Sequence, residues 1–154
     1  KLLLLGDILY HGPRNDLPKD YAPKKVIEIL NGMKEELLCI RGNCDCEVDQ
    51  MVLKFPILAD YAAFWLGDLM VWATHGHVYN MNNLPPFKKG DILLHGHTHI
   101  PAAQSFGDGY YYINPGSLSI PKEGSKNSYM ILEGRTFTLK SVEDGSVISS
   151  FTVE

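Results

Sequence analysis

The sequence predicts an α/β fold, in which strand and helix alternate through the first third of the chain and β-hairpins make up most of the rest. Between two short apolar runs near the start, apolar residues recur at helical spacing, namely Val26, Ile27, Leu30, Met33 and Leu37. Further on, pairs of short apolar runs flank Gly-containing turns, which is typical of hairpins. The chain has 154 residues, of which 45% are apolar and 21% charged. These values predict one globular domain over residues 1–154 that can bury its own core.

Short local signals predict the elements of the first third. Leu2–Leu5 is a continuous apolar run that ends at Gly6-Asp7, which predicts a strand covered on both faces. The segment 10–21 is rich in Pro, Asn, Asp and Gly and predicts a loop, and Pro23 suits the first turn of the helix that follows. Two elements complete this third, a second buried strand over 37–40 and a short helix over 47–53.

The remaining two thirds predict strands joined by tight turns. The predicted strands are 62–66 and 69–74 around Gly67-Asp68, 92–95, 102–106 and 110–113 around a Gly-Asp-Gly turn, 128–132, 136–142 and 147–153. Two-residue and three-residue connections that contain Gly favour antiparallel pairing of the strands on either side.

Composition argues against several classes of protein. The formal net charge is −4 and the basic residues do not cluster, so we expect no binding to nucleic acid. No apolar run is long enough to cross a bilayer, so we expect no membrane partner. Cys39, Cys44 and Cys46 are too few and too close for a disulfide framework, which favours the cytoplasm. The sequence leaves open whether the protein forms a homo-oligomer.

Four short polar stretches each follow a predicted strand. They are Gly6-Asp7, the GNCD of 42–45, the HGH of 75–77 and the GHTH of 96–99. Ligands of open α/β sheets lie at the carboxyl ends of strands, so these four loops can converge on one place. Their Asp, Asn and His residues form a mixed oxygen and nitrogen ligand set that suits Mn, Fe or Zn better than Ca or Mg.

The spacing of His97 and His99 supports a metal site. Alternate residues of an extended segment point the same way, about 6–7 Å apart, and the ions of a hydrolytic pair lie about 3.5–4 Å apart. Each histidine could therefore reach a different ion, with Asp7 between them. Taken singly, each of these residues reads as an ordinary turn or loop residue, and their joint occurrence favours metal. His95 still belongs to the strand, which favours a structural part.

The order GD, GNCD, HGH, GHTH, NPGS resembles the calcineurin-like metallophosphoesterase superfamily. Within it, the chain is most similar to the small bacterial and archaeal phosphodiesterases of the YfcE type, which share the HGPRN of residues 11–15. The resemblance implies a four-layer α/β/β/α sandwich with two central sheets. It also implies a divalent metal cofactor, two ions and often Mn, with Zn, Fe or Ni as alternatives. The family's first motif, D-x-H, is absent, so we expect the chain to lack the first βα unit, roughly 30 residues.

The resemblance assigns the metal ligands and the catalytic positions. Asp7 would bridge the ions, Asn43, His75 and His97 would complete one site, and His99 would serve the other. The catalytic positions fall on Asn43, Cys44 and His75. Cys44 replaces a histidine that protonates the leaving group in many members, and Tyr10 replaces the aspartate that orients it. A thiol with a pKa of about 8.5 is a poor acid for this purpose, so good leaving groups are expected; Cys44 as a packed residue without chemistry is equally open.

Three further residues are candidates for substrate binding. His11 and Arg14 follow Asp7 and could hold a phosphate, although exposed loop polars explain them equally well. His77 could face phosphate or only orient its neighbour. The segment 114–117 predicts a type II turn that could support the metal loops.

We therefore expect a metal-dependent phosphodiesterase that hydrolyses a small phosphoester by attack of a metal-activated hydroxide. The alternative is a non-catalytic scaffold of the same fold that binds protein partners, as the retromer subunit Vps29 does. The presence of Asp7, Asn43, His75, His97 and His99 favours the enzyme.

Overall fold

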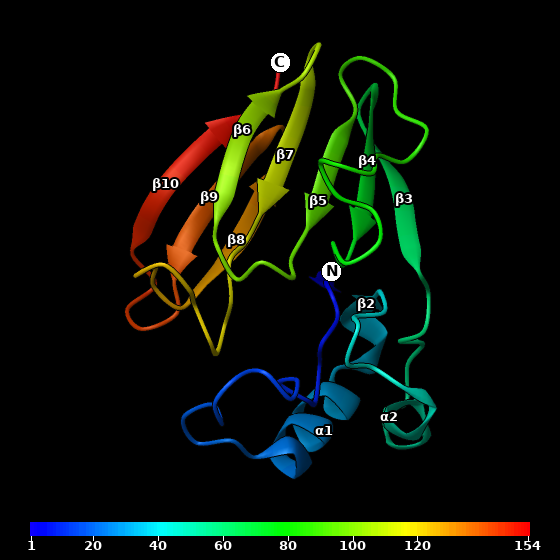
Figure 1. Cartoon of the computed structure of the whole chain (residues 1–154), viewed down its shortest axis with the longest axis vertical. Helices are drawn as coiled ribbons and strands as arrows, with labels where there is room; N and C mark the ends of the chain where they lie inside the picture. The colour runs from blue at the N-terminus through cyan, green and yellow to red at the C-terminus, as the bar shows by residue number, and fades with distance from the viewer.

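The computed structural model describes residues 1–154 and contains three β-sheets and two α-helices. The strands are β1 (Leu2–Leu4), β2 (Leu37–Cys39), β3 (Tyr61–Leu66), β4 (Leu69–Thr74), β5 (Ile92–His95), β6 (Ala102–Phe106), β7 (Tyr110–Asn114), β8 (Ser128–Glu133), β9 (Thr136–Ser141) and β10 (Val147–Thr152). The helices are α1 (Pro23–Gly32) and α2 (Glu47–Val52), with a 3-10 turn over Lys34–Glu36. Figure 1 shows the larger sheets at one end of the molecule and the helices at the other. Neither helix is long and apolar enough to span a membrane.

The helical end is built from β1, β2, α1 and α2. Helix α1 begins at Pro23, as predicted. Its apolar stripe packs on a core of five buried residues, Leu9, Cys39, Leu53, Phe55 and Ile57. The prediction that the first two strands are covered on both faces is wrong. β1 pairs only with β2 in a parallel two-stranded sheet, and Leu2 and Leu38 are 42% and 46% exposed.

The hairpins predicted for the rest of the chain are confirmed. β3 and β4 pair antiparallel with Leu66 opposite Leu69, and β6 and β7 pair around their Gly-Asp-Gly turn. The five-stranded sheet has the order β3-β4-β5-β7-β6, and a three-stranded antiparallel sheet has the order β10-β9-β8. A second core lies between these sheets, formed by Leu69, Val71, Ile92, Ile113, Phe137 and Val153.

The predicted α/β class is confirmed, but residues 1–154 form three sheets rather than the two central sheets that the resemblance implied. β1 and β8 belong to different sheets. For the site, the important feature is that β1 runs parallel to β2 and β4 runs parallel to β5. The loops that follow β1 and β4 meet, with Oδ2 of Asp7 3.3 Å from Nε2 of His75.

Candidate active site

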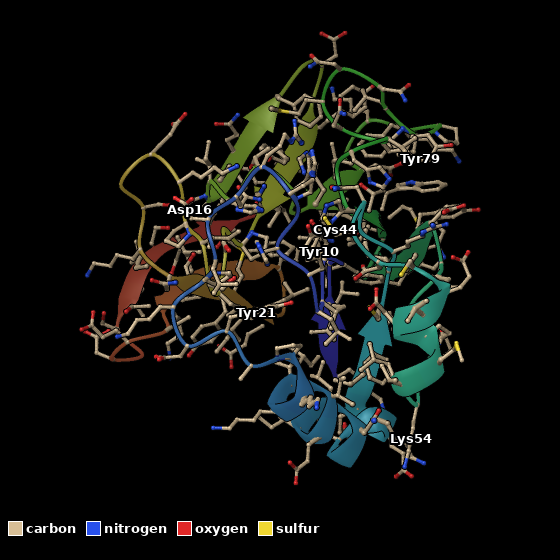
Figure 2. The ribbon with its side chains drawn as sticks, turned by 60° about the horizontal axis from the view of Figure 1, so that its bottom comes forward. Tyr10, Asp16, Tyr21, Cys44, Lys54 and Tyr79 are labelled. Atoms are coloured by element: carbon tan, nitrogen blue, oxygen red, sulfur yellow. The ribbon has the colours of Figure 1, made fainter.

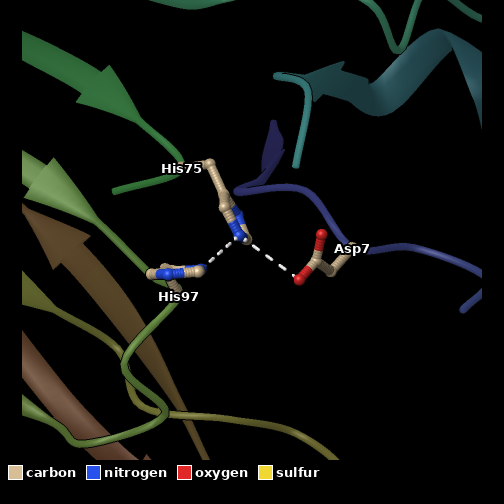
Figure 3. Close-up of side chains that lie close together, drawn as sticks. All are labelled: Asp7, His75 and His97. Carbon is tan, nitrogen blue, oxygen red and sulfur yellow. Dashed lines mark hydrogen bonds and ion pairs between the residues drawn. The ribbon is translucent and has the colours of Figure 1, made fainter. Parts of the chain in front are cut away.

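The four polar loops converge, as the sequence predicted. In Figure 3, Nε2 of His75 lies 3.3 Å from Oδ2 of Asp7 and 3.1 Å from Nδ1 of His97. The same nitrogen lies 3.1 Å from Oδ1 of Asn43. One ligand atom from each of Asp7, His75 and His97 lies within 4.8 Å of the others, a spacing that can hold one metal ion. The loops after β1, β2, β4 and β5 therefore meet around His75.

The protonation of His75 shows why a cation fits there. Nδ1 lies 2.6 Å from the carbonyl oxygen of Leu5, so this nitrogen carries the proton and donates it. Nε2 then presents a lone pair to the Asp7 carboxylate and to Oδ1 of Asn43, which also only accept. Three facing lone pairs require a proton on Nε2 or a cation among them. The mixed oxygen and nitrogen donors suit Mn, Fe or Zn.

The pKa values of the cluster agree with this arrangement. Burial alone would lower the pKa of His75, but the hydrogen bond and charge of Asp7 raise it above its ordinary value. Burial would raise the pKa of Asp7, and the hydrogen bond and charge of His75 outweigh it, so that the pKa lies below its ordinary value. Burial, followed by the charge of His75, lowers the pKa of His97 to about 4. The Asp7 carboxylate therefore favours positive charge at His75, at the position where a divalent ion would bind.

Two glycines allow the loops after β1 and β2 to touch. A Cβ on Gly6 would lie 2.3 Å from the backbone nitrogen of Gly42, and a Cβ on Gly42 would lie 2.1 Å from Oδ1 of Asp7. Asp7 itself has a φ of 56°, in the left-handed region that non-glycine residues seldom adopt. Close backbone contact at this point thus sets the direction of the Asp7 carboxylate.

Asp45 holds this contact together, and the sequence analysis did not single it out. Its buried carboxylate accepts hydrogen bonds from the backbone N–H groups of Asp7 at 2.8 Å, Ile8 at 2.8 Å and Gly42 at 2.7 Å. The sequence offered one signal for it, namely its place in the GNCD stretch beside the candidate residues Asn43 and Cys44. The sequence alone does not show that the carboxylate turns inward to the backbone.

The extended geometry predicted for His97 and His99 is wrong. Both residues have left-handed backbones, with φ of 63° and 62°, and they lie in the loop after β5. The reason is that the chain turns sharply after Gly96, so strand alternation does not apply. His97 contacts His75, whereas Nδ1 of His99 lies 2.9 Å from the carbonyl oxygen of Ile120. That bond occupies Nδ1 and leaves Nε2 of His99 with a lone pair.

Asn114 forms hydrogen bonds to the loop that carries His97 and His99. It is fully buried, and Nδ2 lies 3.0 Å from the carbonyl oxygen of Gly96 and 3.0 Å from Oγ1 of Thr98. Its Oδ1 accepts from the N–H of Gly116, which has the positive φ expected of a type II turn. His95 lies beside this network, 2% exposed, with its ring 4.7 Å from that of Tyr112.

A hollow of about 290 Å³ opens in front of the cluster. It is lined by Asp7, His11, Gly12, Pro13, Arg14, Asn15, Asn43, Cys44, His97, His99 and Lys122. Most of the candidate residues therefore meet there, including His11 and Arg14. His77 is not among the lining residues; it is exposed, and its ring lies 5.3 Å from that of His75. The sequence analysis gave no role to Asn15, the last residue of the HGPRN stretch, or to Lys122, which belongs to no motif.

Cys44 lies on the floor of the hollow with its thiol protonated near neutral pH. Burial and then the charge of Asp7 raise the pKa of Cys44 to about 11. Its backbone N–H donates to Oδ1 of Asp7 at 2.9 Å, and a Cβ on Gly12 would lie 3.2 Å from its sulfur. Figure 2 labels Cys44, which follows β2, and Tyr10, Asp16 and Tyr21 along the loop between β1 and α1.

Comparison with known proteins gives a match to the calcineurin-like phosphoesterase superfamily domain over residues 2–136. The chain belongs to the calcineurin-like phosphoesterase superfamily. It is 44% identical to the Escherichia coli K12 protein named phosphodiesterase YfcE, over 99% of this chain and 82% of that protein. The solved structure of YfcE, a phosphoesterase from E. coli, superposes with a TM-score of 0.93 at 43% identity and covers 99% of this chain and 83% of that one.

Two further matches share less of the sequence with this chain. The probable metallophosphoesterase YsnB of Bacillus subtilis is 26% identical over 70% of this chain and 81% of its own length. The structure of vacuolar protein sorting 29 from Cryptosporidium parvum has a TM-score of 0.54 at 20% identity, covering 97% of this chain and 96% of that one. At this identity the likeness to vacuolar protein sorting 29 concerns the fold alone.

Proposed function

We propose that the chain, as one metallophosphoesterase domain over residues 1–154, is a metal-dependent phosphodiesterase that hydrolyses small phosphoesters. The observation that carries the proposal is the set of facing lone pairs on Asp7, Asn43 and His75 at the edge of a polar hollow. The 44% identity to a protein named phosphodiesterase supports the same reaction. Nothing beyond the shared fold supports the alternative of a Vps29-like scaffold.

Each residue has a proposed part in the reaction. Asp7, Asn43, His75, His97 and His99 would hold divalent metal, for which we propose Mn²⁺. The bound metal supplies Lewis-acid chemistry at the phosphoryl group and an activated water. The Leu5 carbonyl orients His75 by holding its Nδ1–H. Arg14 and His11 line the hollow and would bind the phosphate oxygens, and His77, whose ring lies 5.3 Å from that of His75, would support His75.

The reaction adds the oxygen of one water to phosphorus and breaks one ester P–O bond, giving a phosphomonoester and an alcohol. Cys44 stays a neutral thiol at working pH because its pKa is about 11, so it is a weak proton donor to the leaving oxygen. The site therefore favours esters whose alcohol leaves as a stable anion. The three free cysteines support the cytoplasm as the place of action.

The test is hydrolysis of bis(4-nitrophenyl) phosphate by the purified protein after treatment with EDTA and after addition of Mn²⁺, Zn²⁺, Fe²⁺, Ni²⁺ or Mg²⁺. We expect release of 4-nitrophenolate only with metal, and most with Mn²⁺. The His75→Gln variant is the control for a contaminating enzyme. Metal-loaded, folded protein that leaves the ester intact would refute the proposal.

A further inference from the structure

Two loops that are distant in the sequence form the side walls of the hollow in front of Asp7. The loop after β1 contributes Arg14, and the loop between β7 and β8 contributes Lys122. Figure 1 shows these loops, blue and gold, on the same side of the molecule below the larger sheets. A substrate in the hollow would therefore lie between two cationic side chains.

Neither cation is neutralised by the protein. The ion pairs in the structure are Lys1–Glu36, His75–Asp7 and Arg135–Asp68, so no carboxylate lies within 4.0 Å of Arg14 or Lys122. Asp7 is the one carboxylate among the lining residues. The whole chain has a formal charge of −4, so the hollow carries charge of the opposite sign to the protein around it. Such a site attracts substrates with more than one negative charge.

The backbone of Lys122 is attached to the metal-site loop. Its N–H donates to the carbonyl oxygen of His99 at 3.1 Å. Its own carbonyl accepts from the N–H of Ser125 at 3.0 Å and from the Ser125 hydroxyl at 2.6 Å. The ring of His99 returns a bond to the carbonyl of Ile120 at 2.9 Å. Lys122 therefore has a defined position relative to His99, unlike a lysine on a loose loop.

The other lining residues indicate what the hollow excludes. It contains no Phe, Tyr or Trp, so the aromatic platforms typical of nucleobase stacking are missing from it. Its volume of about 290 Å³ is at the lower end for small-molecule sites. Recognition there has to come from charge and hydrogen bonds on a small ligand.

We propose that Lys122 binds a second anionic group of the substrate, while Arg14 binds the phosphate that is cleaved. The substrate class is then a small phosphodiester that carries a further phosphate or carboxylate beyond the ester that is cleaved. This inference rests on the proposed phosphodiesterase function and names the substrate of the same site. One cation would serve the scissile phosphate and the other the distal anion.

The experiment uses two esters with the same leaving group. One is 4-nitrophenyl propyl phosphate, and the other has a propyl chain that ends in a phosphonate, which the enzyme cannot hydrolyse. Both release 4-nitrophenolate, so the ratio of their kcat/KM values reports the distal anion alone. We expect the Mn²⁺-loaded protein to prefer the phosphonate ester by on the order of tenfold at low salt. The preference should shrink at 0.15 M salt, where the Debye length is about 8 Å.

Variants assign the preference to Lys122. Lys122→Gln should bring the ratio close to one, and Lys122→Arg should restore most of it. Lys126→Gln is the matched control, because Lys126 is exposed on the same loop and does not line the hollow. It should keep the wild-type ratio.

The outcomes separate this inference from the proposed function. A wild-type ratio near one, or a ratio that Lys122→Gln leaves unchanged, overturns the inference while hydrolysis of the plain ester still supports the function. If neither ester is hydrolysed, the proposed function fails. Titration calorimetry with the phosphonate ester then decides the inference: weaker binding to Lys122→Gln than to Lys126→Gln supports it, and equal binding overturns it.

Discussion

The carboxylate of Asp45 holds the backbone of Asp7, with Oδ2 of Asp45 2.8 Å from the Asp7 nitrogen. The same oxygen accepts the N–H of Gly42 at 2.7 Å, so one buried side chain joins the loops after β1 and β2. Asp7 faces His75 through its own carboxylate at 3.3 Å. Asp45 therefore influences the cluster of Asp7, His75 and His97 indirectly, by fixing the backbone from which the Asp7 carboxylate extends.

Asp45→Ala should destabilise the protein and weaken metal binding together. The variant leaves three backbone N–H groups without an acceptor, two of them in the loop of Asp7 and Ile8. We expect the free energy of unfolding to fall by roughly 3 kcal/mol and the affinity for Mn²⁺ by roughly 10-fold to 100-fold. Urea unfolding and metal titration measure the two effects. Asp60→Ala, at an exposed position, should change neither, and normal Mn²⁺ affinity in folded Asp45→Ala would contradict the prediction.

The metal-free protein should be most stable near pH 6.5, which is the ordinary pKa of a histidine side chain. The raised pKa of His75 contributes stability that is present below pH 6.5 and lost as the pH rises through that pKa. Burial lowers the pKa of His77, His95, His97 and His99, so the unfolded chain binds more protons below pH 6.5 and stability falls there.

Thermal unfolding in EDTA between pH 5 and pH 8 tests this maximum. Mn²⁺ should reverse the slope above pH 6.5, because the ion needs Nε2 of His75 without its proton. In the metal-free His75→Gln variant, stability should change little between pH 6.5 and pH 8. Stability that rises from pH 6.5 to pH 8 without metal would show that Asp7 does not hold a proton on His75.

Replacement of His97 or His99 should lower catalysis, whereas replacement of His95 should lower stability. His97→Ala and His99→Ala each remove a candidate ligand and should lower metal-dependent hydrolysis by at least roughly 100-fold. His95→Ala removes a buried ring that packs on Tyr112, so we expect about 2 kcal/mol less stability and nearly unchanged turnover. Steady-state kinetics and thermal unfolding of the three variants give the comparison. Equal catalytic losses at His95 and His97 with unchanged stability would refute it.

Cys44→Ser should barely slow the hydrolysis of an aryl phosphodiester. The thiol has a pKa of about 11 and the 4-nitrophenolate group departs without a proton, so little proton transfer is at stake. We expect kcat/KM within about threefold of wild type, against the factor of roughly 100 or more that a general acid contributes. A loss of that larger size, in a variant with normal metal content, would assign the thiol a chemical part.

Local patterns in the sequence predicted most elements of the fold. Pro23 and the apolar spacing gave α1, and Gly67-Asp68 gave the β3–β4 hairpin. The predicted coverage of β1 on both faces and the implied number of sheets were wrong, because both depend on which strands pair with one another across the chain. An apolar run such as Leu2–Leu5 looks the same in a two-stranded sheet as in a buried one.

The site was predictable where a motif follows a strand. Asp7, His75 and His97 converge because β1 and β4 run parallel to their neighbours and end at the same place. The left-handed backbone of His99 and the inward turn of Asp45 were not predictable, since both follow from close packing rather than from residue spacing. Lys122 enters the site only through the path of a long loop.

The site lies between two separate cores, one under α1 and one between the larger sheets. Asp7 and Asn43 extend from the first, whereas His75 and His97 extend from the second. A ligand shared by all four residues would couple the opening of one core to that of the other. In hydrogen exchange, we therefore expect the amides of α1 and β2 to open independently of β4 and β5 without metal, and all to exchange as one cooperative unit when metal is bound.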